Sequence, residues 1–244
     1  MIEKGEIIKR RDLQLYPYII RVLDRDDMPQ VIGLQNFVIN LMENKSFCVS
    51  LTPEEHYEIM DGNGESIGLF VQGKLCAVCS ILFPGRREDN MARQLGFDDQ
   101  ELTHVAQLEL SLVHPDWRGN NLQKRMAGML ARRAKKKKNY RYLFTTVSPY
   151  NYPSIKTVTS MGLNIVKLCK MYCQWDRYVV YKNLVNPVRL DKSSTIHVPG
   201  TFFEKQRELL NNGYLGFSQF KDEEGIKIMF AKKIHSYRIL SQEG

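Results

Sequence analysis

Hydrophobic residues alternate with polar ones along some stretches of this chain and recur at helical spacing along others. Residues 108–113, LELSLV, alternate leucine with polar neighbours, a period of two that is typical of a half-buried strand. Pro115 ends this pattern, and over about 120–138 the apolar residues recur every three or four positions, which predicts a helix. The chain therefore passes from a buried strand to a helix through a short basic turn that contains Arg118 and Gly119.

Upstream of this turn, periodicity and turn residues predict two helices and three strands. In chain order we expect a strand at 18–23, a helix capped by Asp26 or Asp27 that ends near Met42, a short helix after a capping box at Thr52 that ends near Asp61, and hairpin strands at 67–72 and 75–83. Residues 84–105 are polar, contain Pro84 and Gly85, and show no strong period. We therefore expect them to form the long irregular segment of the domain.

Downstream of the turn, the pattern predicts three more strands and one helix. In chain order we expect a strand at 141–147, a helix from about Ser154 to Met161 that ends at Gly162, and strands at 163–175 and 177–184. The helix after strand 108–113 supplies the one crossover, so this strand and strand 141–147 are expected to lie parallel, whereas hairpins join the other neighbours. The fold class is therefore α/β, of the α+β type, with a mixed sheet.

The composition of the sequence changes after Asn186 and Pro187. Residues 188–200 are polar and turn-rich, and the segments that follow predict a short helix over 201–213 and a hairpin of strands at 214–220 and 225–234. We expect a first domain over 1–186 and a small C-terminal α/β appendage over 187–244. The appendage could complete the sheet, cover a substrate groove or mediate dimerisation.

Composition places the chain among ordinary globular proteins. Hydrophobic residues make up 43% and charged residues 25% of its 244 residues, and no apolar run reaches the roughly 18 residues that a membrane-spanning helix needs. The charged N-terminal stretch lacks the apolar run of a signal peptide, so we expect a cytoplasmic protein without a membrane partner. Cys76 and Cys79 stand three apart in a predicted strand, where their side chains point to opposite faces, so we expect no metal site.

The net charge of +8 indicates an anionic partner without identifying it. Lysines 135–138 fall in the last turn of a predicted helix, where cations complement the helix dipole. We interpret this run as a solvated helix end and keep a nucleic-acid surface as the lesser alternative.

The basic turn has the chemistry of an anion site. A helix N-terminus leaves backbone N–H groups unpaired and carries partial positive charge. Arg118 adds a guanidinium that can bind a phosphate with two hydrogen bonds, and Gly119 lets the backbone approach a ligand closely. These features suit a phosphate group, and an ordinary tight turn is the alternative.

Two stretches of the chain resemble the signature motifs of one enzyme superfamily. The run LSLVHPDWRGNNLQKRM, residues 110–126, resembles the apolar-x-V-x-P-x-x-R-G-x-G-[IL]-[GA] motif of the GNAT acetyltransferases. The run VSPYNYPSIKTVTSMGLNIV, residues 147–166, resembles the family's second motif, with Asn151 after the strand and Gly162 at the end of the helix. The resemblance covers roughly residues 18–184 and implies a GNAT-like sheet, mixed and mostly antiparallel, flanked by helices.

The resemblance implies that the chain binds acetyl-CoA as its cosubstrate. In the family, the end of the first motif's strand pairs its backbone with the pantetheine arm, the amides of the turn hold the pyrophosphate, and the asparagine of the second motif contacts the pantetheine region. Carried over residue by residue, these roles fall on Leu112 and Val113, on Arg118, Gly119, Asn120, Asn121, Leu122 and Gln123, and on Asn151. Ser154 either contacts the cofactor or caps its helix, which is the simpler role.

The sequence departs from the family pattern at three positions. Asn121 replaces the motif's second glycine, which is tolerable because asparagine adopts unusual backbone angles more readily than most residues. Gln123 replaces a small residue, so its side chain must point away from the pyrophosphate or make a polar contact with it. Val158 stands where the family's second-motif helix carries a tyrosine acid. Tyr152 and Tyr150 are the candidate replacements, and each also fits a packing role.

Acetyl transfer to an amine requires an unprotonated amine, a site for the tetrahedral oxyanion and a proton for the leaving thiolate. Glu109 and Gln107 lie where family members often place a base, and alternation puts them with Ser111 on the face opposite the leucines. A carboxylate on a half-buried strand can have a raised pKa and act through water. Glu109 is therefore the candidate base, and an ion pair with a nearby lysine or arginine is the alternative.

These inferences predict an N-acetyltransferase that moves an acetyl group from acetyl-CoA directly to a primary amine of a small molecule or peptide, with Glu109 and Tyr152 as the catalytic residues. Direct transfer follows because no cysteine stands in an evident nucleophile setting. Two alternatives remain: a coenzyme-binding module that has lost catalysis, suggested by Val158, and a nucleic-acid binder that uses the basic residues of 132–141. A homodimer is compatible with each of them.

Overall fold

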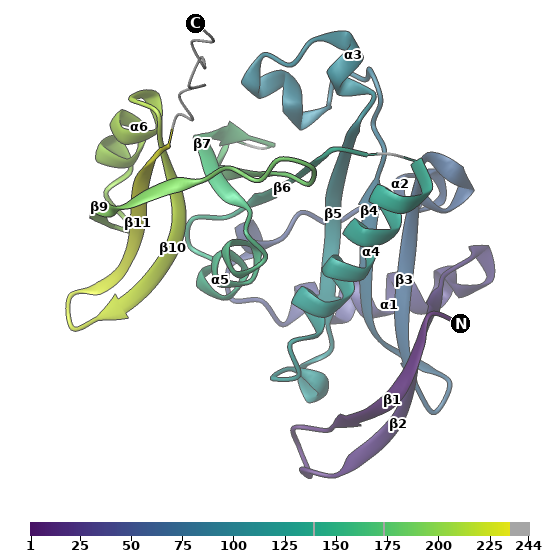
Figure 1. Ribbon diagram of the computed structural model, residues 1–244. Coiled ribbons are helices and arrows are strands. Elements are labelled where there is room, and N and C mark those ends of the chain that lie inside the picture. The colour runs from purple at the N-terminus through teal and green to yellow at the C-terminus, as the bar shows by residue number, and fades with distance from the viewer. Residues whose placement is uncertain (139, 173, 235–244) are drawn as a thin grey trace, which may run out of the picture.

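The computed structural model describes residues 1–138, 140–172 and 174–234. The strands form one sheet (Figure 1), and their order across it is β1 (Glu3–Ile8), β2 (Leu15–Val22), β3 (Gly64–Val71), β4 (Lys74–Leu82), β5 (Val105–Val113), β6 (Tyr142–Val147), β8 (Trp175–Asn183), β7 (Asn164–Met171), β10 (Tyr214–Asp222), β11 (Gly225–Lys233) and β9 (Leu190–Pro199). Every neighbouring pair is antiparallel except β5 and β6, which are parallel. The prediction of a mixed, mostly antiparallel sheet with one crossover is confirmed.

Helices cover both faces of the central strands (Figure 1). The helices are α1 (Met28–Asn40), α2 (Pro53–Glu58), α3 (Asp99–Leu102), α4 (Leu122–Lys138), α5 (Tyr152–Ser160) and α6 (Phe203–Asn211). On one face Leu130 of α4 packs in an apolar cluster with Ile67 of β3, and on the other Val31 of α1 packs with Val78 of β4 and Leu110 of β5. Because both faces are buried, β3 and β4 appear in the sequence as nearly continuous apolar runs.

The start of α2 was predicted correctly, whereas the cap of α1 was not. Thr52 accepts a hydrogen bond from the amide of Glu55, whose carboxylate accepts one from the amide of Thr52, as the capping box predicts. Asp27 holds the cap position of α1 but makes no capping hydrogen bond. Instead its carboxylate accepts two hydrogen bonds of 2.6 Å from Arg21, and Asp24 caps the short 3-10 turn just before α1.

The two strands at the edges of the sheet escaped prediction. β1 reads EKGEII and β9 reads LDKSSTIHVP, and each has a single fully buried residue, Ile7 and Val198 respectively. An edge strand pairs on one side only, and these two leave most of their side chains in solvent, so neither shows the apolar alternation of a half-buried strand. The prediction of a turn-rich stretch over 188–200 is wrong for this reason.

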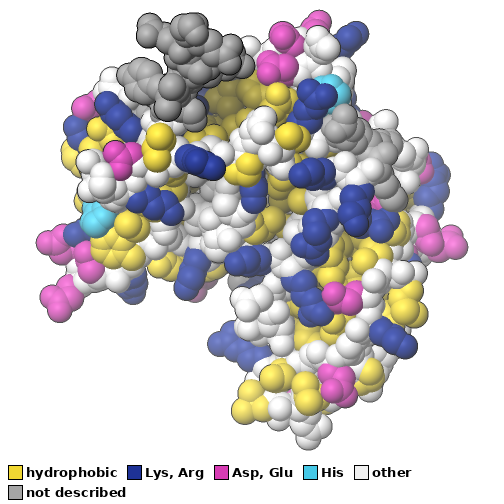
Figure 2. All heavy atoms as spheres, in the orientation of Figure 1, with side chains coloured by type: hydrophobic (Ala, Val, Ile, Leu, Met, Phe, Trp, Pro, Cys, Tyr) yellow, Lys and Arg dark blue, Asp and Glu magenta, His cyan; other side chains and the backbone are white. Residues whose placement is uncertain are grey.

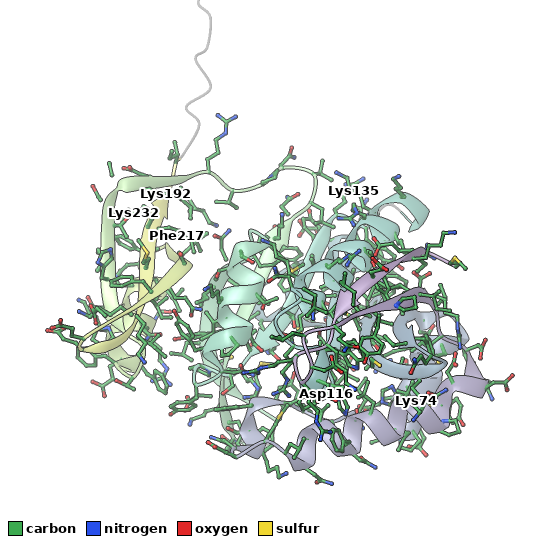
Figure 3. All side chains as sticks on the ribbon, turned by 90° about the horizontal axis from the view of Figure 1, so that it is seen from below. Lys74, Asp116, Lys135, Lys192, Phe217 and Lys232 are labelled. Carbon is green, nitrogen blue, oxygen red and sulfur yellow. The ribbon has the colours of Figure 1, made fainter. Side chains whose placement is uncertain are left out.

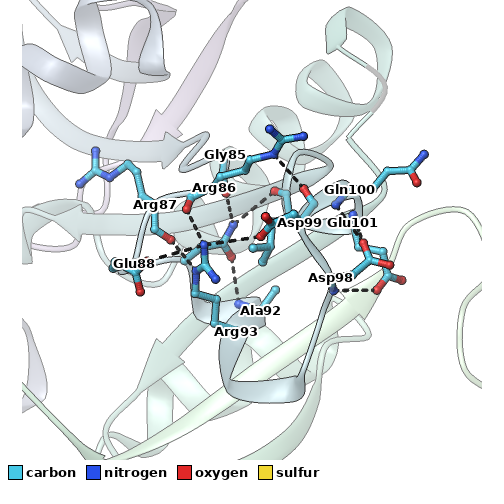
Figure 4. Close-up of polar contacts among 12 residues, drawn as sticks. Gly85, Arg86, Arg87, Glu88, Ala92, Arg93, Asp98, Asp99, Gln100 and Glu101 are labelled. Carbon is cyan, nitrogen blue, oxygen red and sulfur yellow. Dashed lines mark hydrogen bonds and ion pairs between the residues drawn. The ribbon is translucent and has the colours of Figure 1, made fainter.

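Residues 84–105 are more ordered than their composition indicates (Figure 4). The guanidinium of Arg93 donates hydrogen bonds to the carbonyls of Arg86 and Arg87, at 2.6 and 3.0 Å. A 3-10 helix over Met91–Leu95 and the short α3 follow. The expectation of a wholly irregular segment is therefore wrong, because side-chain to backbone bonds order this stretch without any apolar period.

The C-terminal strands continue the main sheet. β10 joins it through one residue pair, Gly216 opposite Ile165 of β7, and Phe230 of β11 is buried in the same apolar cluster as α4 and β3. Figure 3 shows these strands, marked by Lys192, at the end of the molecule away from Asp116, which marks the turn between β5 and α4. The expected division of the chain after residue 186 stays a prediction.

Two absences apply to the described ranges. No helix within them combines the length and the apolar character needed to cross a membrane. Nor does any cluster of three or more His, Cys, Asp or Glu side chains there have the arrangement of a metal site.

Candidate active site

β5 and β6 diverge after a short parallel contact. Their pairing ends at Gln107, whereas β5 stays paired with β4 as far as Val113 and β6 with β8 as far as Val147. Among the described residues, the edge of β5 that faces β6 therefore has no strand partner from Glu109 onward. A cavity of about 440 Å³ opens at this divergence, lined from both strands, from α4 and α5, and from the segments near residues 48 and 90.

Glu109 is the extra residue of a β-bulge at the divergence. On β4, Ser80 pairs with Leu110 and the next residue, Ile81, pairs with Leu108. The extra residue shifts the alternation by one position, so Leu108 and Leu110 lie on opposite faces of the sheet. Leu108 packs in the cluster of α4, and Leu110 packs in the cluster of α1. The prediction that these leucines share one face is therefore wrong. The carboxyl group of the bulged residue lines the cavity, as bulged residues beside active sites commonly do.

The surroundings of Glu109 give it the proton affinity of a base that works at neutral pH. Burial raises the pKa of Glu109 to about 7, and the carboxylates of Asp89 and Glu55 act in the same direction. Its carboxyl group accepts a 2.8 Å hydrogen bond from the side-chain amide of Gln107, whose oxygen in turn accepts a 2.6 Å bond from the amide of Met91. Within the described ranges, no lysine or arginine forms an ion pair with Glu109.

The turn after β5 carries two left-handed residues. Gly119 has a φ of 92° and Asn121 a φ of 55°, so the asparagine that replaces the family's glycine does adopt an unusual, left-handed backbone conformation. The first N–H groups of α4 have no acceptor within the helix. Gln123 donates a 3.1 Å hydrogen bond to the carbonyl of Ser111, so its side chain points back to β5, where it lines the cavity.

Side chains of this turn brace the N-terminal hairpin and the end of β5. The side chain of Asn120 donates to the carbonyl of Ile8 at 2.8 Å and accepts from its amide at 3.3 Å, which leaves only its backbone N–H for a ligand. Arg118 donates to the carbonyl of Val113 at 3.3 Å. The side chain of Leu112 is buried, so its contribution to a ligand is also restricted to its backbone.

The second motif places Ser154, but not Tyr152, in the cavity. Asn151 caps α5 by accepting a 3.2 Å hydrogen bond from the amide of Ser154, so the cap predicted for Ser154 is wrong, and the serine lines the cavity instead. Asn151 also donates to the carbonyl of Phe47 at 3.4 Å. Tyr152 is the first residue of α5 and is not among the residues that line the cavity. Nor are the residues of 118–122, which lie outside its lining.

A phenol that the sequence analysis missed, Tyr172, lines the cavity. It lies in the turn between β7 and β8 with a φ of 54°, and its hydroxyl group shares a 3.0 Å hydrogen bond with that of Thr146. Tyr172 and Glu109 line the same cavity. Although Tyr172 is 45% exposed, partial desolvation raises its pKa, and the carboxyl group of Glu109 acts in the same direction. The turn contains no glycine or proline, which explains why the sequence predicted a strand straight through 163–175.

Two arginines line the cavity, and they differ in whether their charge is paired. Arg87 pairs with Glu58 and with Asp89, the latter at 2.6 Å, so its charge is balanced. Arg177, near the start of β8, is 2% exposed, and its Nη2 has no hydrogen-bond partner in the described part of the chain. Sequence alone gave no signal for Arg177, because its position depends on how β8 aligns with β6 and β7.

Lys and Arg side chains gather over α4 on the face shown in Figure 2. The exposed ones on this helix are Lys124, Arg125, Arg132, Lys135 and Lys136. Lys135 donates to the carbonyl of Leu184 at 2.9 Å, and Arg125 pairs with Glu3, so two of these cations are engaged within the protein. The side chains of Lys137 and Lys138, the rest of the lysine run, lie outside the described residues.

A diverging strand pair beside a helix N-terminus, with a near-neutral carboxyl group at the divergence, has the features of an acyltransferase that uses a coenzyme A thioester. The model of the acetyltransferase (GNAT) family matches residues 38–163, just over half of the chain. The chain therefore belongs to the GNAT family, and it is an acyltransferase whose cosubstrate is acetyl-CoA.

Solved acetyltransferase structures share the fold at low sequence identity. NAA60 of Arabidopsis thaliana in complex with acetyl-CoA is 12% identical with a TM-score of 0.56, and covers 69% of this chain and 99% of its own. A putative acetyltransferase from Salmonella typhimurium with its cofactor acetyl-CoA is 14% identical with a TM-score of 0.53, and covers 72% and 98%. An N-acetyltransferase from Staphylococcus aureus is 16% identical with a TM-score of 0.52, and covers 68% and 98%. No curated protein matches the chain.

Proposed function

We propose that this protein transfers the acetyl group of acetyl-CoA directly to a primary amine of a small molecule or peptide. The observation that carries the proposal is Glu109, a carboxyl group of near-neutral pKa that lines the cavity and has no cationic partner among the described residues. Such a group takes a proton from the ammonium form of the acceptor, directly or through a water. The freed amine nitrogen then attacks the acetyl carbon.

Two features of β5 and the turn support the binding of the donor. Within the described residues, the edge of β5 from Glu109 to Val113 has no strand partner. Gln123 and Arg118 bond the carbonyls of Ser111 and Val113, so it is the backbone N–H groups of this edge that suit the carbonyls of a pantetheine arm. The left-handed residues Gly119 and Asn121 lead into the start of α4, whose free N–H groups and positive dipole end suit a pyrophosphate. We place the coenzyme along this path.

The cysteines of the cavity support direct transfer over a covalent acyl-enzyme. Cys48 and Cys79 both line the cavity. Burial raises the pKa of Cys48 to about 11 and that of Cys79 to about 12, so both thiols stay protonated at neutral pH. Because the thiolate is the nucleophilic form, neither thiol is prepared to accept an acetyl group.

Tyr172 is the group we assign to protonate the leaving thiolate. Its hydroxyl group faces the same cavity as Glu109 and keeps its proton at neutral pH because burial raises its pKa. Collapse of the tetrahedral intermediate breaks the carbon–sulfur bond, and the phenol supplies the proton that the sulfur takes up. The phenolate then recovers the second proton that the acetylated nitrogen loses, directly or through a water, and Glu109 releases its proton to solvent. This assignment replaces the family tyrosine that is absent at Val158 and differs from the sequence-based choice of Tyr152.

Coenzyme A release across a panel of primary amines tests the proposal. We expect the wild-type protein to consume acetyl-CoA with at least one amine, and Glu109→Gln to lower kcat by about 10²–10⁴-fold while acetyl-CoA affinity, measured by calorimetry, stays unchanged. Glu88→Gln is the matched control, because this glutamate also lines the cavity but its side chain is 95% exposed. Coenzyme binding without turnover of any amine would support the catalytically silent module instead.

A further inference from the structure

Arg177 buries a guanidinium in the cavity wall, and no described residue supplies an anionic partner for it. Its side chain is 2% exposed, its Nη2 lacks any hydrogen-bond partner in the described ranges, and its Nη1 reaches only the carbonyl of Asp176, at 3.4 Å. Burying an unpaired charge is costly, so buried cations in native proteins normally face an anion. Because Arg177 lines the cavity, a ligand bound in the cavity could supply that anion.

The neighbours of Arg177 hold its guanidinium without neutralising it. The rings of Tyr172 and Trp175 lie 5.5 and 5.2 Å from the guanidinium carbon, a cation–π arrangement that positions the charge but leaves it uncompensated. The thiol of Cys48 is close enough to interact electrostatically, but burial raises its pKa to about 11 and keeps it neutral. None of the three supplies a counter-charge.

The adjacent carboxylate is already occupied on the other side of β8. Asp176 pairs with Lys170 at 2.7 Å and with Arg207 at 3.0 Å. Because successive side chains of a strand point to opposite faces, Asp176 and Arg177 cannot turn toward each other without breaking these pairs. Within the described residues, Asp176 therefore has two cationic partners, whereas the buried Arg177 has no anionic one.

The cavity thus contains a proton acceptor and an unpaired cation that are separate from each other. Glu109, Tyr172 and Arg177 line the same cavity, and the ring of Tyr172 lies 5.5 Å from the guanidinium carbon of Arg177. A ligand that matches this arrangement has a protonated amine for the carboxyl side and a single negative charge for the guanidinium side. A phosphate would bring close to two negative charges against one guanidinium, whereas a carboxylate brings one.

We propose that the acceptor is an amino acid, whose carboxylate binds Arg177 while its amine is presented to Glu109. The inference rests on the proposed function and narrows its acceptor from any primary amine to one that carries a carboxylate. Arg177 acts here as a specificity-determining residue, because it touches the acceptor but not the atoms that react.

The test compares matched acceptors, the free amino acids and their C-terminal amides, by steady-state release of coenzyme A. We expect the wild-type protein to prefer the acid over the amide by at least about tenfold in kcat/KM, because a charge-assisted hydrogen bond to a buried cation is lost with the amide. Arg177→Met should abolish this preference, because it raises the KM for the acid much more than the KM for the amide. Arg177→Lys should restore part of it.

Arg207→Met is the matched control. Arg207 lies on α6 and pairs with Asp176, the neighbour of Arg177 on β8, but it does not line the cavity. It should keep the preference of the wild type. Equal rates on acids and amides in the wild type would overturn the inference, and so would an Arg177→Met variant that loses both substrates equally, as a purely structural arginine would. Failure of every amine in both series would instead overturn the proposed function, so the two failures are distinguishable.

Discussion

Glu109 is the residue whose protonation should control the rate. Its carboxyl group must be ionised to accept a proton, and burial raises its pKa to about 7. We therefore expect kcat/KM to rise about tenfold per pH unit below pH ~7 and to level off above it. The ionisation of the acceptor amine adds a second pH dependence to this profile. A pH–rate profile of the wild type and of Glu109→Gln tests this expectation. An identical limb near pH 7 in the glutamine variant would assign the ionisation to another group.

The same carboxyl group should make stability depend on pH. Its pKa is about 7 in the folded protein and close to the ordinary 4.5 in the unfolded chain, so between these values the folded state binds the extra proton. The contribution of Glu109 to stability is therefore greatest at low pH and falls as the pH rises to about 7, by up to about 3 kcal/mol. Urea unfolding should find Glu109→Gln more stable than the wild type at pH 8 and similar to it at pH 5. If the free energy of unfolding differed between the variant and the wild type by the same amount at both pH values, a raised pKa for Glu109 in the folded protein would be contradicted.

Two tyrosines compete for the role of acid, and their environments separate them. Tyr172 lines the cavity near Glu109, whereas Tyr152 lies outside the cavity lining. We expect Tyr172→Phe to lower kcat by about 10–100-fold with little change in the KM for acetyl-CoA, and Tyr152→Phe to leave kcat unchanged. Single-turnover acetyl transfer gives the measurement. A loss confined to Tyr152→Phe would return the assignment to the sequence-based choice.

Residues near a motif could be predicted from the sequence, and residues brought in by distant strands could not. Glu109 could be named as a candidate base because it lies on the strand before the basic turn, where members of the family often place one. Its orientation was missed, because the bulge depends on the register of β4 against β5. Tyr172 and Arg177 come from the hairpin of β7 and β8, whose turn has no glycine or proline that would indicate it in the sequence. The pairing of β8 with β6 brings both residues to the cavity.

The turn before α4 is the element where backbone conformation and coenzyme affinity should be linked. Asn121 sits at a φ of 55°, a region that costs an ordinary residue about 1–2 kcal/mol and a β-branched residue more. We expect Asn121→Val to weaken acetyl-CoA binding by about tenfold and to lower the free energy of unfolding by about 1 kcal/mol. Asn121→Gly, which restores the usual glycine of the family, should keep the affinity. Calorimetric titration with acetyl-CoA measures both variants, and an unchanged affinity in Asn121→Val would argue against pyrophosphate binding at this turn.

At the scale of elements, the depth of burial decided what the sequence could predict. β3, β4 and β5 are covered on both faces, and their apolar runs marked them clearly. β1 and β9 form the two edges and are mostly exposed, so their sequences carried no such mark. The crossover from β5 through α4 to β6 was predictable because a right-handed βαβ connection needs a helix of this length between two parallel strands.

At the scale of the whole molecule, the C-terminal part supports elements that line the cavity. The side chain of Gln219 on β10 donates a 2.9 Å hydrogen bond to the carbonyl of Tyr152 at the start of α5, and Gln206 on α6 pairs with the hydroxyl group of Tyr178 on β8. Both α5 and β8 contribute residues to the cavity. Residues 187–234 therefore contact elements that line the cavity without lining it themselves, and association into a homodimer stays a prediction.

Deletion of residues 187–244 tests whether the chain folds as two independent parts or as one. Phe230 and Leu209 are buried in the same apolar cluster as Ile165 and Tyr178 of the first part, so the deletion would expose apolar side chains on β7 and β8. We expect the truncated protein to unfold at a clearly lower temperature than the full chain and to bind acetyl-CoA more weakly.

A point substitution examines the same packing without removing a segment. Phe230→Ala should lower the free energy of unfolding by about 3–5 kcal/mol, because it removes a large, fully buried side chain, whereas Lys192→Ala on the exposed face of β9 should change it by less than about 0.5 kcal/mol. If residues 1–186 instead unfolded at the temperature of the whole chain and Phe230→Ala left that transition untouched, the C-terminal part would be a separate domain. The shared sheet would then be a contact between two folding units rather than a common core.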